Sequence, residues 1–128
     1  MRENLYRAKR KDDGKWIEGY FYKIWDKVFL LWGMTNDTPN MEEVIPETVG
    51  QYTGLKDIND KKIFEGDIIK GTIVSQWSKR KIVCRIVWKI DGFVSIDRKN
   101  FIHKVKFAKD IEVIGNIHDN PELLEEEE

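Results

Sequence analysis

The side chains that most often carry chemistry are few in this chain of 128 residues. Cys84, His103 and His118 are its only thiol and imidazole groups, and their separations fit no metal-binding motif. His103 falls on the apolar side of an alternating segment, which predicts a hydrogen-bonded core histidine. His118 precedes Asp119, and neighbouring side chains of an extended segment point to opposite sides, which favours a surface position. We therefore expect no metal site and no cofactor.

Nucleophiles and carboxylate pairs give no stronger indication of catalysis. Cys84 shares the period-two face of Ile82 and Ile86, so we interpret it as a small buried hydrophobic residue rather than a nucleophile. The serines lack the glycine-flanked elbow of a hydrolase, and no phosphate-binding glycine loop is present. Glu65 and Asp67 fit turn capping better than acid–base catalysis. We assign no catalytic residue.

Charge is distributed unevenly along the chain although the net charge is -1. Residues 70–109 contain eleven Lys and Arg against two Asp, and residues 110–128 contain eight acidic residues and no Lys or Arg. Such asymmetry indicates either a surface that binds a polyanion, with the acidic tail as its competitor, or two ordinary solvated surfaces. In the first case the tail masks the basic stretch.

Aromatic residues are interleaved with the basic ones, as in proteins that stack bases and pair Lys or Arg with phosphates. We predict turns at 79–81 and 98–99, with Trp77 exposed beside the first turn. Trp88 and Phe107 fall at inward positions and are expected in the core. The candidate nucleic-acid-binding residues are Trp77, Lys79, Arg80, Lys81, Arg98 and Lys99.

The N-terminal aromatic residues favour a protein interface. The runs Trp16–Tyr22 and Trp25–Trp32 are apolar on both faces, so one face packs on the core and the other meets a second layer or another subunit. Aromatic side chains dominate the binding energy of many interfaces. The candidate interface residues are Trp16, Tyr20, Trp25 and Trp32, and we expect self-association.

Short runs of aromatic and β-branched residues between turn formers predict an all-β fold with little helix. Lys23 and Ile24 separate the first two strands, and residues 33–48 are predicted to be a loop. The later predicted strands are Ile68–Val74, Ile82–Ile90, Phe93–Ile96, 101–107 and Ile111–Ile117, with a hairpin turn at Asp91-Gly92. We expect one domain over residues 1–128: an N-terminal hairpin over about 1–35, a small, strongly bent barrel-like sheet over about 45–118, and an acidic tail over 119–128.

Location is predicted from what the sequence lacks. No segment approaches the ~20 consecutive apolar residues of a membrane span. The first 16 residues contain no apolar run typical of a secretory signal, and a single cysteine forms no internal disulfide. We expect a cytoplasmic protein without membrane contact.

Four segments together carry a family signature: KWIEGY at 15–20, IPETVGQYTGLKD at 45–57, KIFEGDII at 62–69 and IEVIGNIHDNPELL at 111–124. In these segments the chain resembles the YopX family, small proteins encoded by bacteriophages and prophages. The resemblance implies an all-β fold with an SH3-type barrel element and the cytoplasm of a bacterial host. The family has no established activity, so the resemblance transfers no catalytic or binding residue.

Three hypotheses of function follow. The first is a non-catalytic phage or prophage accessory protein that binds protein, including a second copy of itself. The alternative is a nucleic-acid-binding module that uses the basic stretch 70–109. The second alternative is a small-molecule enzyme of a type that the motifs do not identify.

Overall fold

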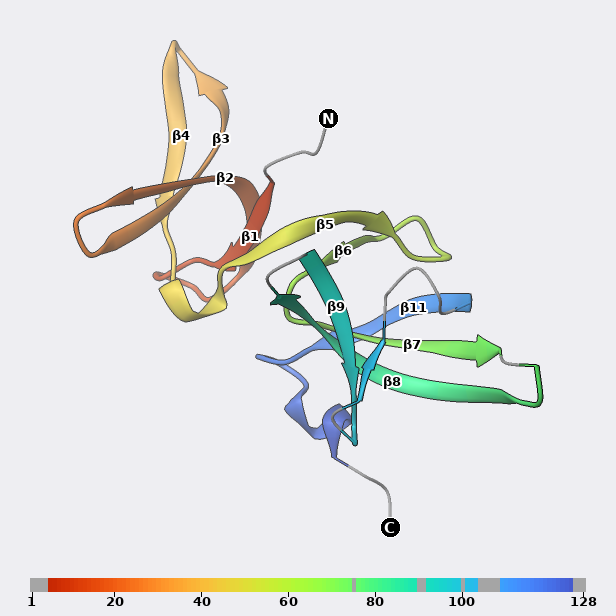
Figure 1. The fold of residues 1–128 in the computed structure, drawn as a ribbon. Helices are drawn as coiled ribbons and strands as arrows, with labels where there is room; N and C mark the ends of the chain where they lie inside the picture. Colours follow the sequence, from red (N-terminus) through yellow and green to blue (C-terminus); the bar gives the residue numbers. More distant parts are fainter. Residues whose placement is uncertain (1–4, 75, 90–91, 100, 104–108, 126–128) are drawn as a thin grey trace. The chain divides into compact units, whose positions relative to one another are not determined.

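Eleven strands and two short 3₁₀ helices make up the described part of the protein (Figure 1). The structure is a computed structural model and describes residues 5–74, 76–89, 92–99, 101–103 and 109–125. The elements are β1 (Tyr6–Lys9), β2 (Trp16–Ile24), β3 (Lys27–Thr35), β4 (Thr38–Glu43), η1 (Pro46–Thr48), β5 (Gly50–Lys56), β6 (Lys62–Phe64), β7 (Asp67–Val74), β8 (Lys79–Lys89), β9 (Gly92–Asp97), β10 (Ile102–His103), β11 (Lys109–Asn116) and η3 (Pro121–Leu124). The all-β prediction is confirmed, but the strands form two antiparallel sheets rather than a closed barrel.

The chain divides by its internal contacts into two units, Met1–Tyr52 and Thr53–Glu128. Strand β5 begins in the first unit and ends in the second. The two units are described separately below.

The first unit has the strand order β4-β3-β2-β1-β5. One face of this sheet packs into a core of Ala8, Val28, Leu30 and Val44, all buried. Thr48 in η1 ties the unit together, because its hydroxyl accepts the Lys9 N–H at 2.9 Å and donates to the Ile45 carbonyl at 2.7 Å.

Strand β2 changes partner at Gly19, pairing with β1 before this residue and with β3 after it. A Cβ atom at Gly19 would lie 2.5 Å from the carbonyl oxygen of Leu31. Because only glycine tolerates this approach of the two backbones, Gly19 is required where the strand passes from one partner to the other.

The structure corrects two predictions in this unit. The first hairpin turns at Trp25-Asp26 rather than at Lys23 and Ile24, with Trp25 in the left-handed region at φ 53°. Residues 33–48, predicted to be a loop, contain the end of β3, all of β4 and η1. The turn formers Asn36 and Asp37 make the β3–β4 turn at φ 52° and 63°.

The second unit contains the sheet β10-β9-β8-β7-β11. Its core consists of Ile63, Ile69, Ile82, Cys84 and Ile86. The predicted alternation in β8 is confirmed for its three core residues.

Two predictions for β8 are wrong. Trp88, expected in the core, is 47 % exposed and packs edge-to-face on Phe93 with ring centroids 4.7 Å apart. Residues Lys79, Arg80 and Lys81, expected in a turn, are the first residues of the strand and pair with Val74, Ile73 and Thr72. The turn formers of this segment precede Lys79, so a run of three cations was a poor indicator of a turn.

Carboxylates that accept backbone N–H groups fix the turns of the second unit. Both oxygens of the buried Asp57 are used: Oδ1 accepts the N–H groups of Asn59 and Lys61, and Oδ2 accepts that of Val113, each at 2.9 Å. Asp67, almost fully buried, accepts the N–H of Phe64 at 2.7 Å. These bonds account for part of the sequence signature around 57 and 67.

Several predictions lie outside the described residues. They concern Phe107 and most of the strand predicted for 101–107, the first residue of the Asp91-Gly92 turn, and the last three glutamates of the tail. Strand β10 covers Ile102–His103, and the side chain of His103 is not described.

Candidate functional site: an apolar face and a basic groove

The face of the first sheet that points away from its core is apolar over three strands. Antiparallel pairing places side chains of directly opposed residues on one face. The rows are Tyr20–Leu31–Met41, Tyr22–Phe29–Glu43 and Met34–Pro39, and all their members except Glu43 are uncharged. We call the uncharged set the hairpin face: Tyr20, Tyr22, Phe29, Leu31, Met34, Pro39 and Met41.

A bulge brings Met34 onto the hairpin face. Between Trp32, which pairs with Asn40, and Met34, which pairs with Pro39, the register shifts by one residue. The extra residue is Gly33, at φ 54°. Because strand side chains alternate, Met34 would otherwise lie on the opposite face with Trp32.

Exposure differs between the two faces of β2, β3 and β4, although Phe21 and Trp32 on the core side are 43 % and 36 % exposed. On one face Val28 and Leu30 are buried in the core. On the hairpin face Tyr20, Tyr22, Met34 and Met41 are between 45 % and 65 % exposed. This explains why strict alternation of apolar and polar residues fails in this part of the sequence.

The four candidate interface residues do not form one cluster. Tyr20 belongs to the hairpin face, Trp25 lies 90 % exposed in the β2–β3 turn, and Trp32 lies on the other face of β3. Trp16 is partly buried and has the Arg7 guanidinium 4.7 Å and the Lys9 ammonium 5.5 Å from its ring centre. Sequence reasoning did not identify Met34 and Met41, because it assigned their segment to a loop.

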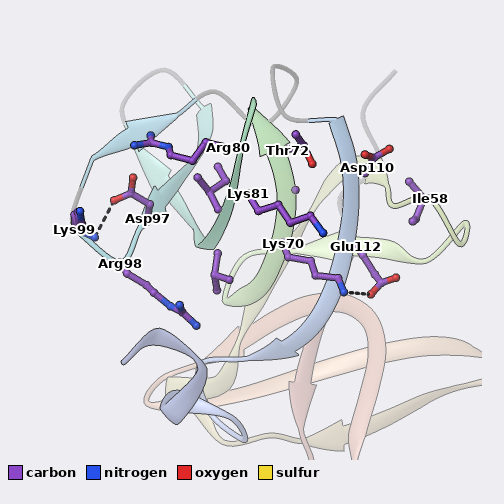
Figure 2. A pocket seen from close by; sticks show the side chains of 13 residues that line it. Ile58, Lys70, Thr72, Arg80, Lys81, Asp97, Arg98, Lys99, Asp110 and Glu112 are labelled. Atoms are coloured by element: carbon purple, nitrogen blue, oxygen red, sulfur yellow. Dashed lines mark hydrogen bonds and ion pairs between the residues drawn. The ribbon is translucent and has the colours of Figure 1, made fainter. Parts of the chain in front are cut away.

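The second unit contains a groove of about 850 Å³ along β7, β8 and β11 and the β9–β10 turn (Figure 2). We call it the basic groove. Its charged lining residues are Lys70, Arg80, Lys81, Arg98 and Lys99 against Asp97, Asp110 and Glu112, and its other lining residues are Ile58, Gly71, Thr72, Ile82 and Val83.

Some of these charged side chains form ion pairs or hydrogen bonds within the protein. Lys70 pairs with Glu112 at 3.3 Å, as the dashed line in Figure 2 shows. Asp97 is buried, and its Oδ1 accepts the N–H groups of Lys99 and Phe101 at 2.9 Å. In the described part of the chain, the exposed side chains of Arg80 and Lys81 make no ion pair.

Arg98 has a structural contact of its own. Its Nε and one terminal nitrogen donate to the carbonyl oxygen of Leu123 at 3.1 and 2.9 Å, and so join η3 to the β9–β10 turn. Two of its donors are therefore used within the protein.

Four of the six candidate nucleic-acid-binding residues line the basic groove: Arg80, Lys81, Arg98 and Lys99. Trp77 and Lys79 are not lining residues. Trp77 is 86 % exposed in the turn between β7 and β8, three residues before Arg80. The groove also contains Lys70, which the sequence placed in the basic stretch but did not single out.

The remaining groups with catalytic potential are in structural positions. Cys84 is fully buried, and burial raises the pKa of its thiol to about 11. Glu65 and Asp67 flank the turn at Gly66, which has φ 91°, and Asp67 binds a backbone N–H there. Over the described ranges no three His, Cys, Asp or Glu side chains are grouped as metal ligands. Likewise, no helix in the described chain has the length and apolar character to cross a membrane.

Comparisons with known proteins agree with the sequence signature. The family model described as YopX protein matches residues 5–125. The structure is similar to the crystal structure of protein EF1440 from Enterococcus faecalis, with a TM-score of 0.56 and 25 % identity over 98 % of this chain and 100 % of that one. A search of curated proteins found no match. The chain therefore belongs to the YopX family.

Proposed function

We propose that this chain, which belongs to the YopX family, is a non-catalytic phage or prophage accessory protein of the bacterial cytoplasm that acts by binding protein. We propose further that it associates with a second copy of itself through the hairpin face. The observation that supports this is that five of the seven hairpin-face side chains are exposed, on one face of a sheet whose other face packs on a core.

The size of the hairpin face supports a binding role. Its four most exposed side chains leave roughly 500 Å² to solvent, which is near the upper end of the patches found on monomers, ~300–600 Å². A specific interface buries about 800 Å² on each partner. The hairpin face supplies most of that area, and tyrosine and methionine are among the residue types enriched in interfaces.

The composition of the face favours a second copy as the partner. In a two-fold dimer each surface patch meets itself, so a patch of one charge sign would repel its symmetry mate. The seven residues of the hairpin face are uncharged, and the charged residues that β3 and β4 direct to the same side are Lys27 and Glu43. Glu43, opposite Phe29 on β4, forms an ion pair with Lys11 at 3.0 Å, so its charge is balanced within one copy.

Sedimentation equilibrium at several protein concentrations tests the proposal. We expect the wild type to exceed the mass of one chain, and Met34→Glu to lower the mass because two like charges would face each other in the dimer. Ile58→Glu is the matched control, since Ile58 is 61 % exposed but belongs to the second unit. Circular dichroism confirms that each variant is folded.

Two results would overturn self-association through this face. A wild type that sediments as one chain at high micromolar concentration rules out the second copy. A Met34→Glu variant that keeps the assembled mass, as the control does, shows that the contact lies elsewhere.

A further inference from the structure

We propose that the basic groove binds the phosphate backbone of single-stranded nucleic acid, with Arg80 and Lys81 as the phosphate contacts and Trp77 as a stacking surface. This inference is independent of self-association, because the groove and the hairpin face belong to different units. It rests on the charge balance of the groove, its dimensions and the position of one exposed aromatic ring.

The charge balance follows from the internal contacts. Glu112 neutralises Lys70, and the carboxylate of Asp97 is buried and engaged by backbone N–H groups. The exposed charges that remain at the groove are Arg80, Lys81 and Lys99 against Asp110. The groove therefore presents a net positive field to solvent, which attracts anions.

The position of the cations favours an extended anion over a compact one. Arg80 and Lys81 are consecutive in β8, and Figure 2 shows that their side chains run apart, Arg80 toward Asp97 and Lys81 toward Lys70. A volume of about 850 Å³ exceeds what one phosphate fills. A polymer with a charge on each repeat can bring a separate charge to each of the two cations, whose side chains leave β8 on opposite sides.

The exposed ring of Trp77 favours a nucleic acid over an acidic peptide as the ligand of the groove, and a single strand over a duplex. It lies in the turn that leads into β8, about 10 Å along the chain from Arg80 at the rise of an extended strand. Its indole is 86 % exposed, so most of this apolar ring is in contact with water. An unpaired base can stack on such a ring and remove its surface from water. Bases in a duplex are already stacked and do not offer this face.

Fluorescence anisotropy with a labelled random single-stranded DNA 12-mer tests the proposal on the full chain at low and near-physiological salt. We expect Arg80→Gln with Lys81→Gln to weaken binding at least tenfold at low salt. Loss of two phosphate contacts should lower the slope of log affinity against log salt by about 1.4. Trp77→Ala should weaken binding about tenfold with the slope unchanged, because stacking releases no counterions.

The matched control is Lys23→Gln with Lys27→Gln, which removes the same charge from exposed strand residues of the first unit. We expect this control to bind as the wild type does. All four substituted cations are exposed, so each double variant should fold, which circular dichroism verifies.

Three outcomes would overturn the inference. Absence of binding at low salt rejects a nucleic-acid site. Equal losses of affinity in the groove variant and the control variant would show that binding depends only on the net charge of the protein. Competition by poly-glutamate or by a duplex of the same length that equals competition by the single strand assigns the groove to acidic protein or to duplex instead.

Discussion

The two units use different chemistry for the same structural task. In the first unit the neutral hydroxyl of Thr48 joins β1 to the η1 turn by binding the N–H of Lys9. In the second unit the carboxylate of Asp57 joins the β5–β6 turn to β11 by binding three N–H groups, one of them from Val113. Bonds to an ionised acceptor are stronger than bonds to a neutral one, but they depend on the charge. The stabilisation by Asp57 should therefore depend on pH, whereas that by Thr48 should not.

The exposed surfaces of the two units also differ in charge. The first unit exposes a largely apolar face, whereas the second exposes cations along a groove. Association through an apolar face suits a protein partner and is not weakened by salt, whereas binding of a polyanion to a basic groove is weakened by salt. The chain thus offers two surfaces that one solution condition, ionic strength, should distinguish.

The largest effect is expected from Asp57→Ala. This variant leaves three backbone N–H groups without their acceptor, which should lower the free energy of unfolding by about 3 kcal/mol. Urea unfolding measures the loss, and hydrogen exchange should place it in residues 57–61 and β11. The control is Asp60→Asn, at an exposed residue of the same turn, and a loss as large in the control would contradict the assignment.

A smaller effect is expected from acid. Burial raises the pKa of Asp57, but the N–H groups of Val113, Lys61 and Asn59 outweigh it and hold the pKa below its usual value of 3.8. A carboxyl group with a lowered folded-state pKa stabilises the protein fully above its unfolded-state pKa and loses this contribution as the pH falls through the folded-state pKa. The difference in unfolding free energy between wild type and Asp57→Asn should be constant from about pH 7 to 5 and shrink below about pH 4. A difference that does not change with pH would show that the charge of Asp57 contributes nothing.

The smallest effect is expected from Thr48→Val, the counterpart in the first unit. Valine keeps the shape but removes both hydrogen bonds, so the free energy of unfolding should fall by about 1 kcal/mol. The loss should be the same at pH 7 and pH 4, because no ionisable group is involved. A loss that grows with acid would contradict the comparison between the two units.

The sequence predicted the strands with clear boundaries and missed those with ambiguous ones. Alternation in β8 located Ile82, Cys84 and Ile86 in the core, and each is buried. Strand β4 was missed because Pro39 and the Asn36-Asp37 turn resemble a loop. Pro39 is compatible with β4 because this strand is at the sheet edge, which the sequence does not reveal.

The candidate surfaces were predicted in part for a similar reason. Composition identified four cations that line the basic groove, but only the fold shows that Lys70 is paired and that Arg98 binds the Leu123 carbonyl. The hairpin face depends on strand register, which is set by the turn at 36–37 and the bulge at Gly33. Sequence alternation alone would place Met34 on the wrong face.

The bulge at Gly33 shifts the alternation of outward and inward side chains along β3 by one residue. Before it, odd-numbered residues of β3 face outward with Leu31, and after it the even-numbered Met34 does so. A chain that lost Gly33 would lose the bulge and still place Met34 opposite Pro39, whereas a chain that kept all residues but paired Gly33 as a regular strand residue would turn Met34 inward. Among related chains, a residue gained or lost in β3 outside this bulge should therefore change which side chains are exposed more than most substitutions do.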